Sequence, residues 1–156
     1  MKLHLLRPLS LGILLCMAAL IAVRAAFAQD ARVVVPSNKS YEQTIAAFKV
    51  AVDKGGMKIM DTYEQGEHFQ GFGAAIHGTL FLVGNPKMGV QAFEKDPAVG
   101  LYLPPRVYIY QGTDGKTYLS YDRPSRLLKQ FHGPTIDKIG GLLDQKLDGL
   151  VHMAAQ

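Results

Sequence analysis

The sequence predicts an α+β domain in which a largely antiparallel sheet of about five strands carries helices packed on one face. Strand-like and helix-like runs alternate too unevenly for a doubly wound parallel sheet. The dipeptide Asp114-Gly115 joins two short runs as an antiparallel hairpin. Ile136, Ile139, Leu143 and Leu147 recur at helical spacing, which indicates a final helix with one buried face.

The boundaries of the elements follow from local signals. Ser40 and Gln43 have the spacing of a capping box, and Asn85-Pro86 is typical of a helix start. Glycine-rich residues 66–78 are predicted to form a loop with at most a short helix. The predicted strands are residues 32–36, 57–63, 79–83, 107–112 and 116–121. The predicted helices are residues 41–54, 86–95, 124–131 and a last one that begins after Thr135.

The hairpin carries an aromatic face. A two-residue type I′ turn at Asp114-Gly115 places Tyr110 opposite Leu119 and Tyr108 opposite Tyr121. Because side chains alternate along a strand, this register predicts that Tyr108, Tyr110 and Tyr121 share one face.

Residues 1–28 are typical of a secretory signal. Lys2 and Arg7 precede an uncharged run over residues 8–23, and Ala26-Phe27-Ala28 ends in small residues suited to cleavage after Ala28. The sequence therefore predicts a periplasmic or secreted protein with no permanent membrane anchor after cleavage. The single cysteine, Cys16, leaves with the signal, which excludes disulfides and thiolate chemistry in the remaining chain.

Charge narrows the range of functions. Three of the 17 basic residues lie in the predicted signal, so the remaining chain has 14 basic and 13 acidic side chains. Such a balance lacks the surplus of Lys and Arg that phosphate binding needs, and we expect no nucleic-acid partner. The apolar fraction of 48% also excludes a disordered chain.

Three histidines are candidates for chemistry. Imidazole is a common metal ligand and acts as an acid or base near neutral pH, so His68, His77 and His132 could hold a metal or a non-covalent haem. His68 could also act as a general base, and all three could be structural. No metal-ligand spacing supports a metal, and no Cys-x-x-Cys-His motif for covalent haem is present.

Other polar residues support binding better than hydrolysis. Tyr108 and Tyr121 could line a pocket or a dimer seam, or pack the sheet against a helix. Asn85 opens a turn that could hold an anion or simply cap a helix. No serine lies in a Gly-x-Ser-x-Gly elbow, which argues against that class of hydrolase.

From residue 80 onward the chain resembles the family called domain of unknown function 302. His68 resembles the histidine of the family's Asp-His pair, with Glu67 where Asp is usual, and His132 resembles a histidine that the family often carries. The resemblance implies a curved antiparallel sheet like that of the TATA-box-binding-protein fold, and a homodimer, without DNA binding. The other residues that carry it are Leu80 to Lys87, Gly89, Leu101, Leu103-Pro104, Val107 to Tyr110, Asp114 to Lys116, Ser120-Tyr121 and Pro124.

Together these observations predict an exported, non-catalytic ligand-binding or accessory protein. Its pocket is expected between residues 66–78, the tyrosine face and the helix at Pro124, facing an unidentified small ligand or a periplasmic protein. The alternative is a periplasmic metal or haem-binding protein that uses His68, His77 or His132. The predicted ligand-contacting residues are His68, Tyr108, Tyr121, His132 and Asn85.

Overall fold

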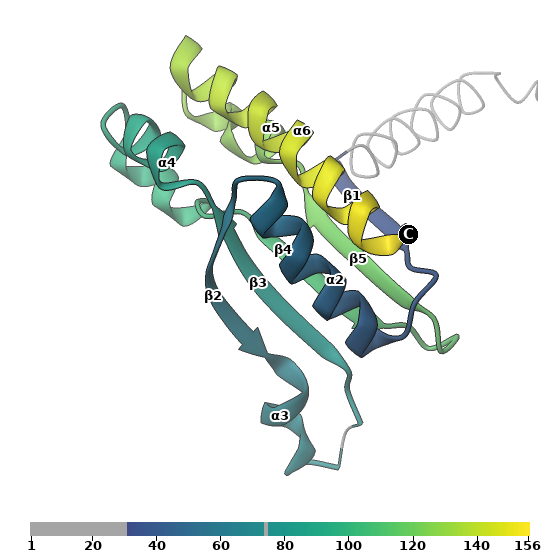
Figure 1. The fold of residues 1–156 in the computed structure, drawn as a ribbon. Coiled ribbons are helices and arrows are strands. Elements are labelled where there is room, and N and C mark those ends of the chain that lie inside the picture. The colour runs from purple at the N-terminus through teal and green to yellow at the C-terminus, as the bar shows by residue number, and fades with distance from the viewer. Residues whose placement is uncertain (1–30, 74) are drawn as a thin grey trace, which may run out of the picture. The chain divides into compact units, whose positions relative to one another are not determined.

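The computed structural model describes residues 31–73 and 75–156, which form an α+β domain with one five-stranded antiparallel sheet (Figure 1). The strands lie in the order β1-β5-β4-β3-β2, and every neighbouring pair is antiparallel. The predicted fold class is confirmed. The predicted signal segment, Cys16 and the cleavage site after Ala28 lie outside the described residues.

The elements agree with the predicted ones in kind and order. A 3₁₀ helix at residues 97–101 was not predicted, and the helix predicted over residues 124–131 is α-helical to residue 127 and 3₁₀ over residues 128–130. The strands are β1 (Arg32–Pro36), β2 (Lys58–Glu64), β3 (Gly78–Gly84), β4 (Arg106–Gln111) and β5 (Thr117–Asp122). The helices are α2 (Tyr41–Lys54), α3 (Gln65–Gln70), α4 (Pro86–Phe93), η1 (Pro97–Leu101), α5 (Pro124–Leu127), η2 (Leu128–Gln130) and α6 (Pro134–Ala155).

Helices α2 and α6 cross one face of the sheet and enclose the core (Figure 1). Phe48 of α2 is fully buried against Phe81 of β3, with 5.3 Å between the ring centroids. The apolar stripe of α6 is buried as predicted, from Ile136 to Leu150. Among the described residues, no helix crosses the opposite face of the sheet, where the side chains are half-buried.

Side-chain caps fix where the helices begin. The Ser40 hydroxyl accepts a hydrogen bond from the Gln43 amide, and the Gln43 side chain accepts one from the Ser40 amide, so the predicted capping box is confirmed. Asn85 caps α4 in the predicted way, with Pro86 at the first helical position. No helix in the described part of the chain is long and apolar enough to cross a membrane.

The predicted hairpin register is wrong by one residue. Tyr108 lies opposite Ser120 and Tyr110 opposite Tyr118. The loop has three residues instead of two, because the Gly112 amide bonds the Lys116 carbonyl and Gly115 adopts a positive φ of 77°. Tyr118 therefore shares the uncovered face with Tyr108 and Tyr110, whereas Tyr121 points to the helix side.

The two ends of the sheet differ. The α4 end, where Gly84, Arg106 and Asp122 lie, is bordered by α4, η1 and α5. The α3 end, where Glu64 and Gly78 lie, is bordered by α3 and the hairpin loop (Figure 1). The seven residues of β3 separate these ends by about 20 Å.

Candidate functional site

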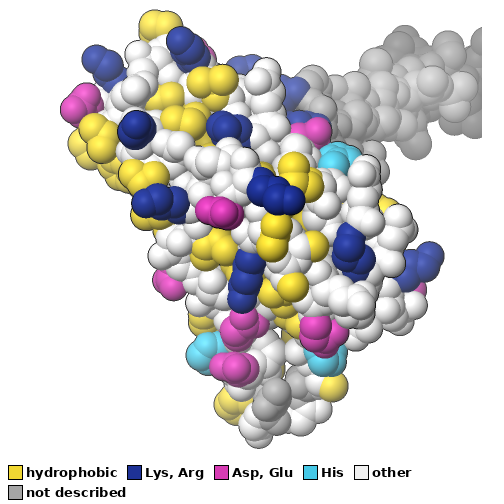
Figure 2. Space-filling view, in the orientation of Figure 1, with side chains coloured by type: hydrophobic (Ala, Val, Ile, Leu, Met, Phe, Trp, Pro, Cys, Tyr) yellow, Lys and Arg dark blue, Asp and Glu magenta, His cyan; other side chains and the backbone are white. Residues whose placement is uncertain are grey.

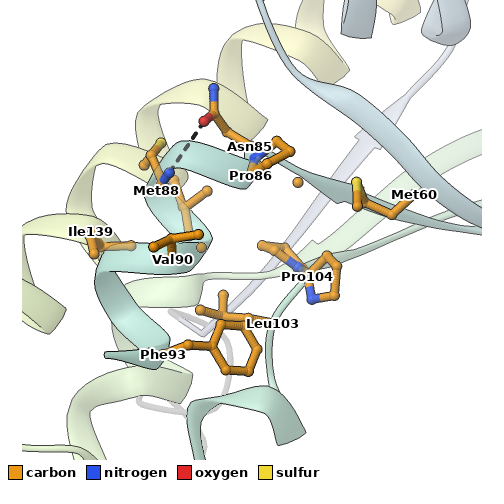
Figure 3. A pocket seen from close by; sticks show the side chains of 13 residues that line it. Met60, Asn85, Pro86, Met88, Val90, Phe93, Leu103, Pro104 and Ile139 are labelled. Atoms are coloured by element: carbon orange, nitrogen blue, oxygen red, sulfur yellow. Dashed lines mark hydrogen bonds between the residues drawn. The ribbon is translucent and has the colours of Figure 1, made fainter. Parts of the chain in front are cut away.

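An apolar pocket lies at the α4 end of the sheet (Figure 3). Its volume is about 300 Å³, which is at the lower limit of small-molecule sites. Val90 is 58% exposed and Met60 51% exposed, so the cavity is open to solvent on their side. The lining residues are Met60, Gly84, Asn85, Pro86, Met88, Gly89, Val90, Phe93, Leu103, Pro104, Pro105, Ile139 and Leu143.

A β-bulge in strand β2 brings Met60 to the pocket. Ile59 pairs with Val83 and Asp61 pairs with Leu82, so Met60 is an extra residue without a partner across the strands. Bulges of this kind redirect a side chain at the edge of a sheet. Gly84 lets the side chains of Met60 and Pro104 pack closely against strand β3, because a Cβ at Gly84 would lie 3.3 Å from Met60 Cγ and 3.3 Å from Pro104 Cβ.

Asn85 is the only polar side chain of the lining, and its polar atoms are already engaged. Its Oδ1 accepts hydrogen bonds from the amides of Lys87 and Met88, at 3.1 and 3.3 Å. Its Nδ2 donates to the Gly56 carbonyl at 3.1 Å. Asn85 therefore holds the start of α4 against the α2–β2 turn and shapes the wall.

Helix α6 closes the inner wall, with Ile139 and Leu143 each 3% exposed. In Figure 3 these elements surround one space, with Phe93 and Leu103 on one side and Met60 on the other. No lining residue has a titratable side chain. The lining therefore offers no group for acid–base catalysis. Its apolar side chains are suited to holding an apolar group.

The uncovered face of the sheet carries a second, shallower groove. Tyr108, Tyr110 and Tyr118 form a stacked row, with centroid distances of 5.1 and 5.5 Å. Gly78 makes room for this row, since a Cβ there would meet the Tyr108 hydroxyl. Burial raises the pKa of Tyr108 and keeps its hydroxyl neutral. Arg106 and the Arg32–Asp122 ion pair, at 3.0 Å, lie along the same groove.

Tyr121 lies on the other side of strand β5, where it is 3% exposed. Its buried hydroxyl has no hydrogen-bond partner among the described residues. Burial, together with the negative charges of Asp148 and Asp144, raises the pKa of Tyr121 to about 12. A buried hydroxyl without a partner costs free energy, so this residue weakens the fold at its own position.

Replacing Tyr121 by phenylalanine is expected to raise the free energy of unfolding at pH 7 by about 1 kcal/mol. The pKa of Tyr121 is about 12 in the folded state and 10.0 in the unfolded chain, so the unfolded chain ionises first. The free energy of unfolding is therefore unaffected by this group below pH 10 and falls as the pH rises to about 12. Urea unfolding between pH 7 and 11.5 should show a smaller alkaline loss in Tyr121→Phe. Tyr63→Phe, at a 46% exposed position, serves as the control. Equal alkaline loss in wild type and Tyr121→Phe would contradict the assignment.

The histidines lie apart. His68 stacks on Tyr63 with 4.5 Å between ring centroids, and His77 meets Tyr41 edge-on at 5.5 Å, both at the α3 end. His132 precedes α6, whose first residues border α4, so it lies at the opposite end of the sheet. The structure therefore does not bring His132 to the other two. In the described residues no group of three His, Cys, Asp or Glu side chains could hold a metal ion.

A hydrogen-bonded chain stiffens the α3 end. The Thr79 hydroxyl donates to Glu64 Oε2 at 2.5 Å and contacts the Tyr41 hydroxyl at 2.5 Å. Because a hydroxyl has one proton, Tyr41 donates to Thr79 when Thr79 donates to Glu64. This chain ties α2 to β2 and β3 at a fully buried threonine. It leaves His77 at the edge of the cluster, exposed to solvent.

The groove on the tyrosine face runs from Gln65, the first residue of α3, past Tyr108 and Tyr110 to Leu127 of α5. It therefore joins the tyrosine face to α5 as expected, but neither residues 66–78 nor Pro124 is among its lining residues. Of the predicted residues, Asn85 borders the apolar pocket and Tyr108 borders the groove. Tyr121 is also among the residues that line the groove, although it is only 3% exposed. Whether any of them contacts a ligand stays a prediction. Sequence reasoning missed the apolar pocket. The one signal for it was the number of apolar residues on a short helix, Met88, Val90 and Phe93, which is more than the inward face of that helix can bury.

Comparison with known proteins identifies the family. The family described as "Domain of unknown function DUF302" matches residues 33–154, and no curated protein matches the chain. A similar solved structure is that of the uncharacterized conserved protein DUF302 from Bacillus stearothermophilus, with a TM-score of 0.73 and 18% identity. The match covers 80% of this chain and 98% of that one, and at this identity it shows a shared fold. The chain therefore belongs to the DUF302 family.

Proposed function

We propose that this protein is exported and binds a small apolar ligand, without catalysis, in the pocket beside Asn85. The single observation that carries the proposal is an open cavity of about 300 Å³ whose lining is apolar except for one amide, which already makes three hydrogen bonds within the protein. Concave, mostly apolar cavities with few polar groups are the usual sites of small-molecule binding. Met60 and Val90 are exposed where they line the pocket, so a ligand can enter without opening the fold.

Substitution at Gly89 tests the site. Gly89 lines the pocket, and a Cβ there would meet no atom within 4 Å. Gly89→Leu is expected to fill part of the cavity and weaken the binding of naphthalene, an uncharged probe, at least tenfold. Gly89→Ala is the matched control, since it improves helix propensity by up to about 1 kcal/mol with little bulk. Fluorescence titration measures the affinity, and thermal unfolding shows that both variants fold.

Two results would contradict this use of the pocket. One is the absence of saturable naphthalene binding to the wild-type protein. The other is equal binding by wild type and Gly89→Leu, which would place the bound probe elsewhere, for example in the tyrosine groove.

Export and dimerisation are part of the same proposal. The segment over residues 1–28 supports export, and the resemblance to the family together with the uncovered tyrosine row supports a homodimer. Native mass spectrometry of protein recovered from the cell envelope should show subunits that begin at Gln29, a doubled mass and any retained ligand. Tyr110→Glu, which puts a charge in the middle of the row, should yield the monomer. An intact N-terminus would refute export, and a monomeric wild type would refute the dimer.

A further inference from the structure

We propose that the apolar pocket takes the alkyl chain of a single-chain amphiphile whose head group is anionic. This inference rests on the proposed function and adds the chemical class of the ligand. It is carried by the size of the cavity, by the positions of charged residues next to the lining, and by the scarcity of free polar groups inside.

The size of the cavity sets the length of the chain. A dry cavity of about 150 Å³ lined by aliphatic side chains holds one benzene ring, which has six carbon atoms. The present pocket has about 300 Å³, and therefore accommodates about ten to twelve carbon atoms by the same measure. Met60 and Met88 give two of its walls unbranched side chains, which adjust to a flexible chain more readily than branched residues do.

The interior of the pocket cannot take a charged head. Asn85 Oδ1 already accepts two hydrogen bonds, and Nδ2 donates one of its two N–H groups to the Gly56 carbonyl. A single remaining N–H does not compensate a buried charge. The first amides of α4 are also occupied, since those of Lys87 and Met88 bond Asn85 Oδ1 and that of Gly89 bonds the Asn85 carbonyl at 2.9 Å. An ion buried without partners costs several kcal/mol, so a charged head has to stay at the mouth.

Three lysines neighbour the lining of the pocket. Lys58 lies opposite Gly84 across the strands, Lys87 lies between Pro86 and Met88, and Lys138 lies beside Met88 and Ile139. We call these three side chains the basic rim. Figure 2 shows Lys and Arg side chains standing among the hydrophobic surface over α4.

The basic rim carries a net positive charge. Among the described residues, no carboxylate lies within ion-pair distance of these three lysines. Asp61 and Glu94 also neighbour lining residues, so the lysines exceed these carboxylates by one positive charge. Asp144, next to Leu143, is bonded to the Ser125 amide and hydroxyl and does not face a rim lysine. An anionic head at the mouth therefore meets a favourable field.

A series of straight-chain carboxylates tests the alkyl part. Isothermal titration of the full-length purified protein with hexanoate, octanoate, decanoate, dodecanoate and tetradecanoate, each below its micelle concentration, should show affinity rising about fourfold per added methylene. The rise is expected to stop at about twelve carbons, when the cavity is full. A flat series would overturn the inference, because an alkyl chain that is not buried gains nothing from length.

Three eight-carbon probes test the head. Octanoate is expected to bind about threefold tighter than octanol at low salt, and octyltrimethylammonium more weakly than either. About 1 M salt, where the screening length is about 3 Å, should remove the advantage of octanoate. The double variant Lys58→Gln/Lys87→Gln should remove it as well, whereas Lys49→Gln/Lys116→Gln, with the same charge change away from the pocket, should preserve it.

The outcomes separate the two proposals. Equal affinity for octanol and octanoate at low salt, or equal losses in both double variants, would refute the anionic head and leave an apolar binding pocket. If none of the probes binds and Gly89→Leu is indistinguishable from wild type, the proposed function itself fails.

Discussion

Replacing Phe48 by alanine is expected to lower the free energy of unfolding by about 3–5 kcal/mol. Phe48 is fully buried where α2 crosses the sheet, and its ring packs against Phe81 of β3. Its removal loses the transfer free energy of the ring and leaves a cavity between two layers that cannot collapse freely. Val50→Ala is the control, since Val50 lies on the same helix and is 53% exposed. Urea unfolding measures both, and a loss below about 1.5 kcal/mol for Phe48→Ala would show that the layers are not tightly packed there.

Two adjacent glycines of α6 are expected to respond in opposite directions to alanine. A Cβ on Gly140 would lie 2.9 Å from Ser125 Cα and 3.3 Å from Ser125 N, whereas a Cβ on Gly141 would meet no atom within 4 Å. Gly140→Ala should therefore lower the free energy of unfolding by about 1–3 kcal/mol, and Gly141→Ala should raise it by up to about 1 kcal/mol.

The start of α5 is held in place and cannot easily move away from a methyl group added at Gly140. The Ser125 amide donates to Asp144 Oδ1 at 3.0 Å, and its hydroxyl donates to Asp144 Oδ2 at 2.5 Å. These bonds hold the start of α5 against α6, so the added methyl group meets backbone that is tied in place. Stability measured by urea unfolding decides the point, and a stabilising Gly140→Ala would show that α5 moves away at little cost.

Local sequence signals predicted the elements well because the forces behind them are local. The Ser40 box and the Asn85-Pro86 start satisfy amides within a few residues of the signal, so they need no knowledge of the rest of the chain. The hairpin register was wrong because Asp114-Gly115 suits two loop lengths. In the structure the Asp114 carboxylate accepts the Lys116 amide and Gly115 takes the left-handed position of a longer loop.

The candidate site was much harder to predict. Its lining comes from β2, α4, the residues before β4 and α6, and no spacing in the sequence connects these segments. Met60 faces the pocket only because of a bulge, which hydrophobic alternation does not reveal. The predicted grouping of His68 with His132 failed for a related reason. The order of strands decides which loops share an end of the sheet, and sequence patterns alone did not fix that order.

The bulge at Met60 has a consequence for how this family can diversify. Strand β2 is at the margin of the sheet and pairs only with β3, so a residue exchanged at the bulge disturbs one neighbouring strand. The sheet and its helices can therefore persist while the residues around the bulge vary. The Bacillus stearothermophilus protein keeps the same fold at 18% identity, which shows how far the sequence can change on this architecture.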